Sequence, residues 1–402
     1  MPRPPHNFIW VGGAGIIILL LLVFVVPLAI EGRYKAISST SATIASGTTT
    51  PVVPEVVHVS TPEAVKAIYM TSCVAGTPSW RNSLMDMIEK SELNAVVIDI
   101  KDYSGSITFV DPTLQGDTSR GCKVKDLAAF IKELHNRNIY VIGRISVFQD
   151  PFYTGTHPEL AVRKLSDGGV WKDYKGLSFI DVGAKPYWDY IVTISKQSYA
   201  MGFDELNYDY VRYPSDGKIS DIKLTWATVQ STGASSTASS TVQAMTKADI
   251  LKSFFVYLHG EMKDTGAKLS VDLFGMTTTN TDDMGIGQVL ENTFAYFDYV
   301  DPMVYPSHYP AGWNGYQNPA THPYEVVKIA MTSARARELA WDVANGVATS
   351  TPSKLRPWLQ DFDLGAPYGV AEVQAQIKAT YDSGLTSWLS WDAGNKYTPA
   401  AY

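Results

Sequence analysis

Two short segments of the chain place an aspartate among alternating apolar residues, where a carboxyl group could do acid–base chemistry. Asp209 lies in ELNYDYV at 205–211, and Asp272 lies in KLSVDLF at 268–274. Hydrolysis of a glycosidic bond needs two carboxyl groups, one as acid and the other as nucleophile or base. If the chain catalyses a reaction of this kind, Asp209 is the candidate nucleophile and Asp272 the candidate acid/base residue.

The sequence neighbours of the two carboxyl groups favour this division of roles. Arg212, which is also a candidate for binding substrate, follows Asp209 closely, and its positive charge would lower the pKa of that carboxyl. Val271 and Leu273 flank Asp272, and apolar surroundings raise the pKa of a carboxyl group. Two alternatives stay open: a surface salt bridge for Arg212 and a hydrogen-bonding support in the core for Asp272.

Further charged and amide side chains alternate with apolar residues in neighbouring segments. We expect Asp99, Lys101, Arg144 and Asn207 to face inward and to bind substrate. Turning such groups inward is costly unless they serve a function or pair with each other. A structural network such as Asp99–Arg144 is therefore the alternative. Asp301 is a rival acid, expected to lie deeper.

Candidates for contact with a ring-shaped ligand lie in the last third of the chain. Tyr305 and His308 stand at and just beyond a predicted strand, and Asp392 ends the last one, where it would orient substrate. Trp391 and Trp313 could stack on sugar rings. For Trp391, packing in the core is an equally open alternative.

These residues would be positioned by eight short apolar segments with helical patterns between them. Apolar residues share one helical face over 124–134 (including Ala128) and another over 250–258, while Pro186 and Pro323 suit first turns. Eight strands with crossover helices over about 340 residues predict one parallel (β/α)8 TIM barrel, whose active site lies at the C-terminal strand ends. The predicted strands are 67–73, 95–101, 140–147, 205–211, 268–274, 299–305, 354–361 and 386–392.

A doubly wound open sheet is the alternative fold, but its Gly-x-Gly-x-x-Gly fingerprint after the first strand is absent. The barrel prediction is weakest at strand seven and at the eighth outer helix, because few residues follow Asp392. Residues 51–66 are a candidate to cover that gap.

The N-terminal part of the chain differs from the rest. Residues 8–30 form an uncharged apolar run long enough to cross a bilayer, which predicts a single transmembrane helix after a cytoplasmic tail, 1–7. A cleaved signal peptide is the alternative. Residues 31–60 are rich in Ser, Thr and Pro and predict a disordered linker. The barrel would occupy 61–402, with a Ser/Thr-rich loop insertion at 228–246.

Composition excludes several classes of protein. The 402 residues carry a formal net charge of −7, which argues against nucleic acid as the main partner. Two cysteines are too few for a disulfide scaffold or a four-thiolate zinc site. We expect no metal and no cofactor, since metal-binding motifs are missing. Cys73 ends the first predicted strand and Cys122 follows the second, so a disulfide on one barrel rim is expected, with two free thiols as the alternative.

Five longer stretches of the chain are specific enough to compare with known families. They are VVIDIKDYSGSITF (96–109), GFDELNYDYVRYPSDG (202–217), LSVDLFG (269–275), YVDPMVYPSHY (299–309) and RPWLQDF (356–362). Together they resemble the putative glycosyl hydrolase domain family over about 67–393. The resemblance implies a (β/α)8 barrel related in pattern to alpha-amylase-like and alpha-galactosidase-like glycosidases, with a glycosidase reaction but no particular sugar.

Two functions follow as hypotheses. The first is a membrane-anchored glycoside hydrolase, single-pass in the cell membrane, that cleaves an extracytoplasmic polysaccharide or oligosaccharide with Asp209 and Asp272. Its partners would be the glycan and, through residues 8–30, the lipid bilayer. The second is a barrel that binds cell-surface glycan without cleaving it, because binding proteins also use Asp and Trp for sugars.

Overall fold

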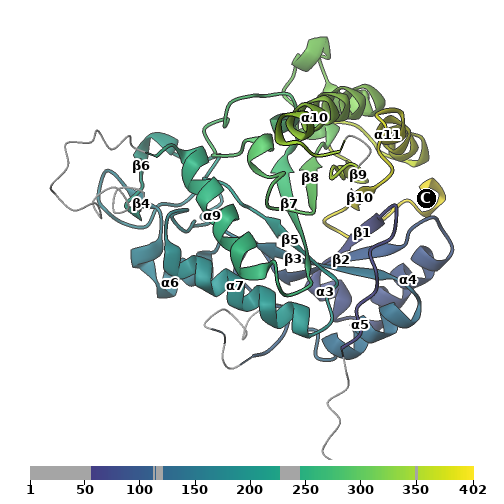
Figure 1. Ribbon diagram of the computed structural model, residues 1–402, viewed down its shortest axis with the longest axis horizontal. Coiled ribbons are helices and arrows are strands. Elements are labelled where there is room, and N and C mark those ends of the chain that lie inside the picture. The colour runs from purple at the N-terminus through teal and green to yellow at the C-terminus, as the bar shows by residue number, and fades with distance from the viewer. Residues whose placement is uncertain (1–55, 112–113, 115–120, 227–244, 349–351) are drawn as a thin grey trace, which may run out of the picture. The chain divides into compact units, whose positions relative to one another are not determined.

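Eight parallel strands close into a barrel in the computed structural model, which describes residues 56–402 except 112–113, 115–120, 227–244 and 349–351 (Figure 1). The order around the barrel is β1-β10-β9-β8-β7-β5-β3-β2, and β1 pairs with β10 to close it. The predicted TIM barrel is therefore confirmed. Its strands are β1 (Lys66–Met70), β2 (Ala95–Lys101), β3 (Tyr140–Ser146), β5 (Glu205–Asp209), β7 (Lys268–Phe274), β8 (Tyr299–Met303), β9 (Trp358–Gln360) and β10 (Trp388–Trp391).

Helices surround the barrel and cover the apolar outer face of its strands (Figure 1). Pro186 and Pro323 stand in the first turns of α7 and α10, as their fixed φ favours. Phe130 rather than the exposed Ala128 completes the buried face of α5, which corrects the predicted pattern. The outer helices are α4 (Pro78–Glu89), α5 (Leu127–Asn136), α7 (Lys185–Ala200), α9 (Lys247–Met262), α10 (Pro323–Asn345) and α11 (Val370–Asp382).

Two connections depart from the predicted alternation of strand and helix. Between β7 and β8 the chain forms only the short 3-10 turns η4 (Gly275–Thr278) and η5 (Leu290–Asn292). After β10 it forms the turn η9 (Pro399–Ala401), which lies against α11. The rings of Trp388 and Tyr402 stack there, 5.8 Å apart.

The segment 56–65 does not replace the eighth helix, contrary to one expectation. The backbone N–H of Val59 donates to Asp204 Oδ1 at 2.7 Å, and Thr61 Oγ1 donates to the Tyr140 hydroxyl at 3.1 Å. Asp204 precedes β5 and Tyr140 begins β3. The segment therefore passes beneath the N-terminal ends of these strands.

Close packing around β3 explains why this strand carries a glycine. A Cβ atom added at Gly143 would lie 2.2 Å from Ile100 Cδ1 and 2.8 Å from Phe203 Cδ1. Such distances are far below van der Waals contact. Gly143 thus allows β2 and the chain before β5 to approach, which sets the position of the neighbouring Arg144.

The remaining predictions of chain organisation fall on the barrel rim or outside the described residues. Cys73 lies in the short helix α3 (Ser72–Ala75), because β1 ends at Met70, and the predicted disulfide with Cys122 is present with Cα atoms 4.8 Å apart. The segments 1–7 and 8–30, residues 31–55 of the predicted 31–60 linker, and nearly all of the 228–246 insertion lie outside the described residues. Among the helices that are described, none is long and apolar enough to span a bilayer.

Candidate active site

A cavity of about 420 Å³ opens at the C-terminal ends of the strands, within the size range of ligand pockets. Both predicted catalytic residues, Asp209 on β5 and Asp272 on β7, line it. The other lining residues are Arg144, Tyr210, Arg212, Ser215, Asp216, Phe274, Gly275, Met276, Met303, Tyr305, His308, Tyr309, Trp358 and Trp391.

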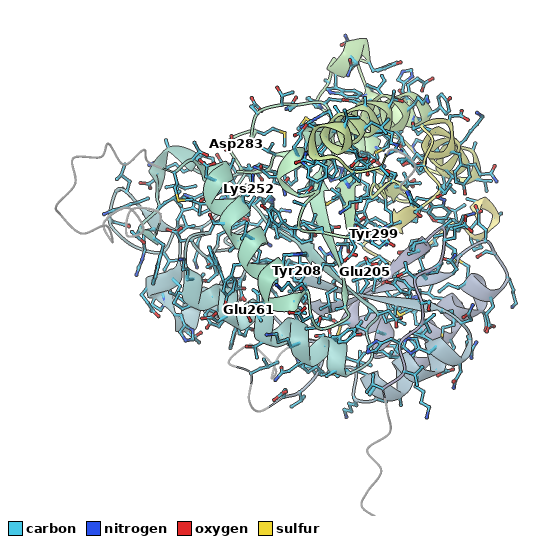
Figure 2. All side chains as sticks on the ribbon, viewed as in Figure 1. Glu205, Tyr208, Lys252, Glu261, Asp283 and Tyr299 are labelled. Carbon is cyan, nitrogen blue, oxygen red and sulfur yellow. A yellow bond between two sulfur atoms is a disulfide. The ribbon has the colours of Figure 1, made fainter. Side chains whose placement is uncertain are left out.

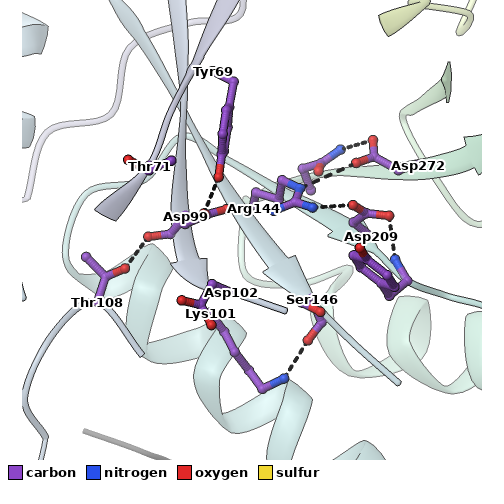
Figure 3. Close-up of polar contacts among 12 residues, drawn as sticks. Tyr69, Thr71, Asp99, Lys101, Asp102, Thr108, Arg144, Ser146, Asp209 and Asp272 are labelled. Atoms are coloured by element: carbon purple, nitrogen blue, oxygen red, sulfur yellow. Dashed lines mark hydrogen bonds and ion pairs between the residues drawn. The ribbon is translucent and has the colours of Figure 1, made fainter. Parts of the chain in front are cut away.

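Arg144 on β3 lies at the centre of the site and contacts three carboxyl groups (Figure 3). Its Nη1 donates to Asp99 Oδ1 at 2.7 Å, and its Nη2 donates to Asp209 Oδ2. Its Nε lies 3.9 Å from Asp272 Oδ2. Arg144 is 5% exposed, so this buried guanidinium balances the carboxylates around it. Both the predicted Asp99–Arg144 pair and the predicted carboxyl pair are thus parts of one cluster.

Both oxygens of the Asp209 side chain accept hydrogen bonds. Oδ2 accepts from Arg144, and Oδ1 accepts from the backbone N–H of Tyr210 at 2.5 Å. Tyr210 has a φ of 53°, a left-handed conformation that is uncommon for a side chain of this size. Strained backbone of this kind clusters at functional sites, and here it turns the N–H back onto the carboxylate.

Asp272 is only 1% exposed and lies beside other carboxyl groups. Burial, followed by the nearby charges of Asp209 and Asp301, holds the pKa of Asp272 well above its usual range. Its Oδ1 accepts from Asn207 Nδ2 at 2.9 Å and from Trp358 Nε1 at 2.8 Å. With two donors on Oδ1, the proton of the neutral acid belongs on Oδ2.

Asp99 belongs to the cluster through its contact with Arg144, but it does not line the cavity. The Tyr69 hydroxyl and Arg144 Nη1 both donate to it, and burial raises its pKa. The Tyr69 ring in turn stacks on Trp391, with ring centres 4.0 Å apart. Asp99 therefore fixes Arg144 and, through Tyr69, one wall of the cavity.

A second charged layer lies beneath the first. Arg356 Nε and Nη2 donate to Asp301 Oδ1 and Oδ2 at 3.0 and 2.9 Å, and Nη1 donates to Glu205 Oε2 at 3.1 Å. Figure 2 places Glu205 and Tyr299 together at the strands, and the Arg356 guanidinium lies 4.1 Å from the Tyr299 ring centre. Burial raises the pKa of Asp301 to about 6, although Arg356 opposes the shift. Asp301 lies outside the cavity lining, as its expected depth implies.

Lys101 does not reach the cavity, contrary to expectation. The pairing of β2 with β3 shifts between Asp99 and Lys101, and a shift of this kind redirects the side chains beyond it. Lys101 Nζ donates to the Ser146 carbonyl at 2.6 Å and pairs with Asp150 at 2.9 Å. Figure 3 shows its side chain directed away from Arg144. Asp150, itself fully buried, caps α6 (Pro151–Thr156), so the pair joins a strand to a helix.

The predicted aromatic and rim residues divide into two groups. Tyr305, His308 and Trp391 line the cavity, and partial burial lowers the pKa of His308. Asp392 and Trp313 do not line it. Asp392 instead accepts from the backbone N–H of Gly394, and Trp313 packs on Tyr309 with ring centres 4.5 Å apart.

Arg212 lines the cavity but makes no ion pair with Asp209. Its guanidinium lies among three aromatic rings, 4.8 Å from the centre of Phe274, 5.1 Å from Tyr210 and 5.7 Å from Phe179. The cation that contacts Asp209 is Arg144. A surface salt bridge therefore does not describe Arg212, whose charge interacts with that of Asp209 only from a distance.

Sequence reasoning did not single out Tyr69, Tyr210, Phe274 or Trp358. Tyr69 follows the same alternation as Ala67 in β1, so its inward direction was readable. Trp358 lies in the short β9, where alternation gives little signal. In the described ranges, no group of three or more His, Cys, Asp or Glu side chains could hold a metal ion.

Comparison with known proteins agrees with this geometry. The family described as a putative glycosyl hydrolase domain matches residues 67–397. The glycoside hydrolase domain of PgaB (BpsB) from Bordetella bronchiseptica is 14% identical with a TM-score of 0.55, and the match covers 82% of this chain and 94% of that one. Alpha-L-fucosidase isoenzyme 2 from Paenibacillus thiaminolyticus is 12% identical with a TM-score of 0.53, covering 84% and 46%.

A hypothetical protein from Ruminiclostridium thermocellum is 26% identical over 55% of this chain and 98% of its own, with a TM-score of 0.43. No curated protein sequence matches the chain. At these identities, the PgaB and fucosidase structures show a shared fold and leave the assignment of roles to the site itself.

Proposed function

Since the chain belongs to the putative glycosyl hydrolase domain family, we propose that it hydrolyses glycosidic bonds with Asp209 as nucleophile and Asp272 as acid/base. The observation that carries this proposal is the shared contact of both carboxyl groups with Arg144 at the wall of one cavity. Arg144 donates a hydrogen bond to Asp209, whereas burial raises the pKa of Asp272. Two carboxyl groups with such different surroundings are typical of a general acid and its partner carboxylate.

The positions of the two strands favour a retaining mechanism. Asn207 pairs with Ser270 and Tyr208 with Val271, so Asp209 and Asp272 stand at equivalent positions of adjacent strands. Neighbouring strands are about 4.8 Å apart, and retaining enzymes hold their carboxyl groups about 5–5.5 Å apart. The proposed outcome is therefore retention of anomeric configuration.

The proposed reaction has two steps. Asp209 attacks the anomeric carbon while Asp272 Oδ2 gives its proton to the leaving oxygen, so that the glycosidic bond breaks as the glycosyl–Asp209 bond forms. Asp272, now ionised, removes a proton from water, and the resulting hydroxide oxygen displaces Asp209 from the sugar. Arg144 accompanies Asp209 through both steps and stabilises its carboxylate when it leaves.

The proposed place of action is outside the cytoplasm, on a polysaccharide, with residues 8–30 as the membrane anchor. The apolar run supports the anchor, and the Cys73–Cys122 disulfide fits an oxidising compartment. Membrane fractionation with mass spectrometry of the amino terminus tests this. A soluble form that begins near residue 31 would identify the run as a cleaved signal peptide.

Hydrolysis of aryl glycosides and cell-wall polysaccharides by the full chain tests the proposed activity. Asp209→Asn and Asp272→Asn should each reduce turnover at least about 10²-fold while the protein stays folded. Asp282→Asn, an exposed turn residue, is the matched control and should keep full activity. Clear glycan binding without turnover by the unsubstituted chain would instead support the non-catalytic glycan-binding barrel.

A further inference from the structure

Arg212 is a buried cation without a direct ion pair among the described residues, although the charges of Asp209, Asp216 and Asp173 act on it from a distance. It is 9% exposed, and no described carboxylate forms an ion pair with it. Its Nη1 donates a hydrogen bond to the Tyr213 carbonyl at 3.1 Å. Burial of an unpaired charge is costly, and the three surrounding rings compensate only in part. A buried arginine without a direct ion pair can bind an anionic group of a ligand.

The position of Arg212 indicates where that anion would come from. It lines the same cavity as Asp209 and Asp272. Arg144, the other cation of the cavity, is already occupied by Asp99 and Asp209. Asp216 lines the cavity but is exposed and does not pair with Arg212. Among the described residues, Arg212 is therefore the arginine of the cavity lining that is left without a direct ion pair.

The groups around Arg212 suit a charged group carried on a sugar ring. Phe274 and Tyr210 are half-buried and line the cavity beside the guanidinium. Aromatic faces of this kind pack on the apolar face of a sugar. The planar guanidinium fork matches a carboxylate with two parallel hydrogen bonds.

We propose that Arg212 binds the carboxylate of a uronic acid, so that the substrate is an acidic polysaccharide. This assignment rests on the proposed hydrolase function and specifies its substrate class. Arg212 acts as a specificity-determining residue: a neutral sugar would leave the buried guanidinium unpaired, and the site would discriminate against it.

Binding of matched acidic and neutral oligosaccharides tests this assignment. The protein is the full chain carrying Asp272→Asn, whose amide imitates the neutral acid and allows binding to be measured by calorimetry without turnover. The probes are galacturonate and glucuronate tetrasaccharides, each paired with its carboxyl-reduced counterpart. At least one acidic probe should bind about tenfold or more tightly than its reduced counterpart.

Adding Arg212→Gln should remove this preference and change the affinity for the reduced probe less than about twofold. Arg212→Lys keeps the charge but cannot donate two parallel hydrogen bonds, so it should show an intermediate preference. This variant serves as the test if the glutamine variant does not fold. Arg137→Gln removes the same charge from an exposed cluster with Glu133 and should keep the full preference. Equal affinities within both pairs of probes, or a preference that survives Arg212→Gln, would overturn the assignment.

The outcomes separate this inference from the proposed function. Acid preference without hydrolysis of any glycan would reject the hydrolase and keep the role of Arg212. Hydrolysis of glycans without acid preference would keep the hydrolase and reject the uronic acid site.

Discussion

The indole Nε1 of Trp358 on β9 donates a 2.8 Å hydrogen bond to Oδ1 of Asp272 on β7. The strand between them is β8, so the bond crosses the inside of the barrel. Together with Asn207 Nδ2, it makes Oδ1 an acceptor only. The acid can then carry its proton on Oδ2, which lies on the side of Arg144 Nε. Trp358 is thus a positioning residue for the proton.

Trp358→Phe should move the basic limb of the pH–kcat/KM profile upward by about one pH unit. Donors to a carboxylate stabilise its ionised form, so losing one raises the pKa of Asp272 further. The acid must be protonated to act, and activity therefore falls as pH rises through that pKa. The measurement is kcat/KM as a function of pH.

Trp388→Phe is the matched control for this substitution. The Trp388 indole donates to the Tyr381 hydroxyl at 3.1 Å, away from the cavity lining. Its loss should leave the basic limb in place. A limb that moves downward in Trp358→Phe, or equally in both variants, would argue against the assignment of Asp272 as the acid.

Asp301→Asn should reduce stability and keep most of the activity. Asp301 shares Arg356 with Glu205 below the cavity, and an amide weakens the charge-assisted bonds to the guanidinium. We expect a loss of about 1–3 kcal/mol in the free energy of unfolding, measured by urea denaturation. Asp264→Asn, in an exposed position, should change it by less than about 0.5 kcal/mol.

The opposite result would change the assignment of the proton donor. If Asp272→Asn retained near-full activity on an identified substrate while Asp301→Asn lost it, the proton donor would be Asp301. The pairing with Asp209 would then cross two strand spacings, roughly 10 Å, which favours inversion.

Alternation along the strands was enough to predict the centre of the site. Asp209, Asp272, Arg144 and Asn207 all face inward, because successive side chains of a strand point to opposite faces. The barrel itself followed from the number and spacing of apolar segments. These features depend on the alternation of apolar and polar residues within each strand, which can be read directly from the sequence.

Features that depend on exceptions to the pattern could not be predicted in this way. A shift in the pairing of β2 with β3 redirects Lys101 to Asp150, and nothing in the sequence AVVIDIK marks this shift. The left-handed Tyr210 is equally invisible, since no glycine signals the turn. Arg212 was placed near Asp209 by sequence distance, whereas the turn carries its guanidinium to the aromatic rings. Long-range packing decides such positions.

Arg144→Met should lower the free energy of unfolding by about 3–5 kcal/mol at neutral pH. The substitution leaves Asp99 and Asp209 buried without their cation. Their pKa values would then rise above those of the unfolded chain, so the native state would bind more protons. The difference in the free energy of unfolding between the variant and the unsubstituted protein should therefore shrink as pH falls through those raised pKa values. Urea denaturation at several pH values measures it.

Arg137→Met is the control for this prediction, because Arg137 pairs with Glu89 and Glu133 on the solvent side of the helices. Exposed ion pairs contribute about 0–1 kcal/mol. A deficit for Arg144→Met that is equally small, or that grows on acidification, would contradict a central structural role for its charge.

Reduction of the Cys73–Cys122 disulfide should lower the free energy of unfolding by about 2–4 kcal/mol. The two residues are 49 apart in sequence, so the bond restricts a long loop of the unfolded chain. It also ties α3, which follows β1, to the loop after β2 on the rim that carries Tyr69 and Asp99. Denaturation with and without reductant measures the change. The double variant Cys73→Ala/Cys122→Ala should have the same free energy of unfolding as the reduced protein, and adding reductant should not change it. Alkylation that labels both thiols of the native protein before reduction would show that the bond does not form.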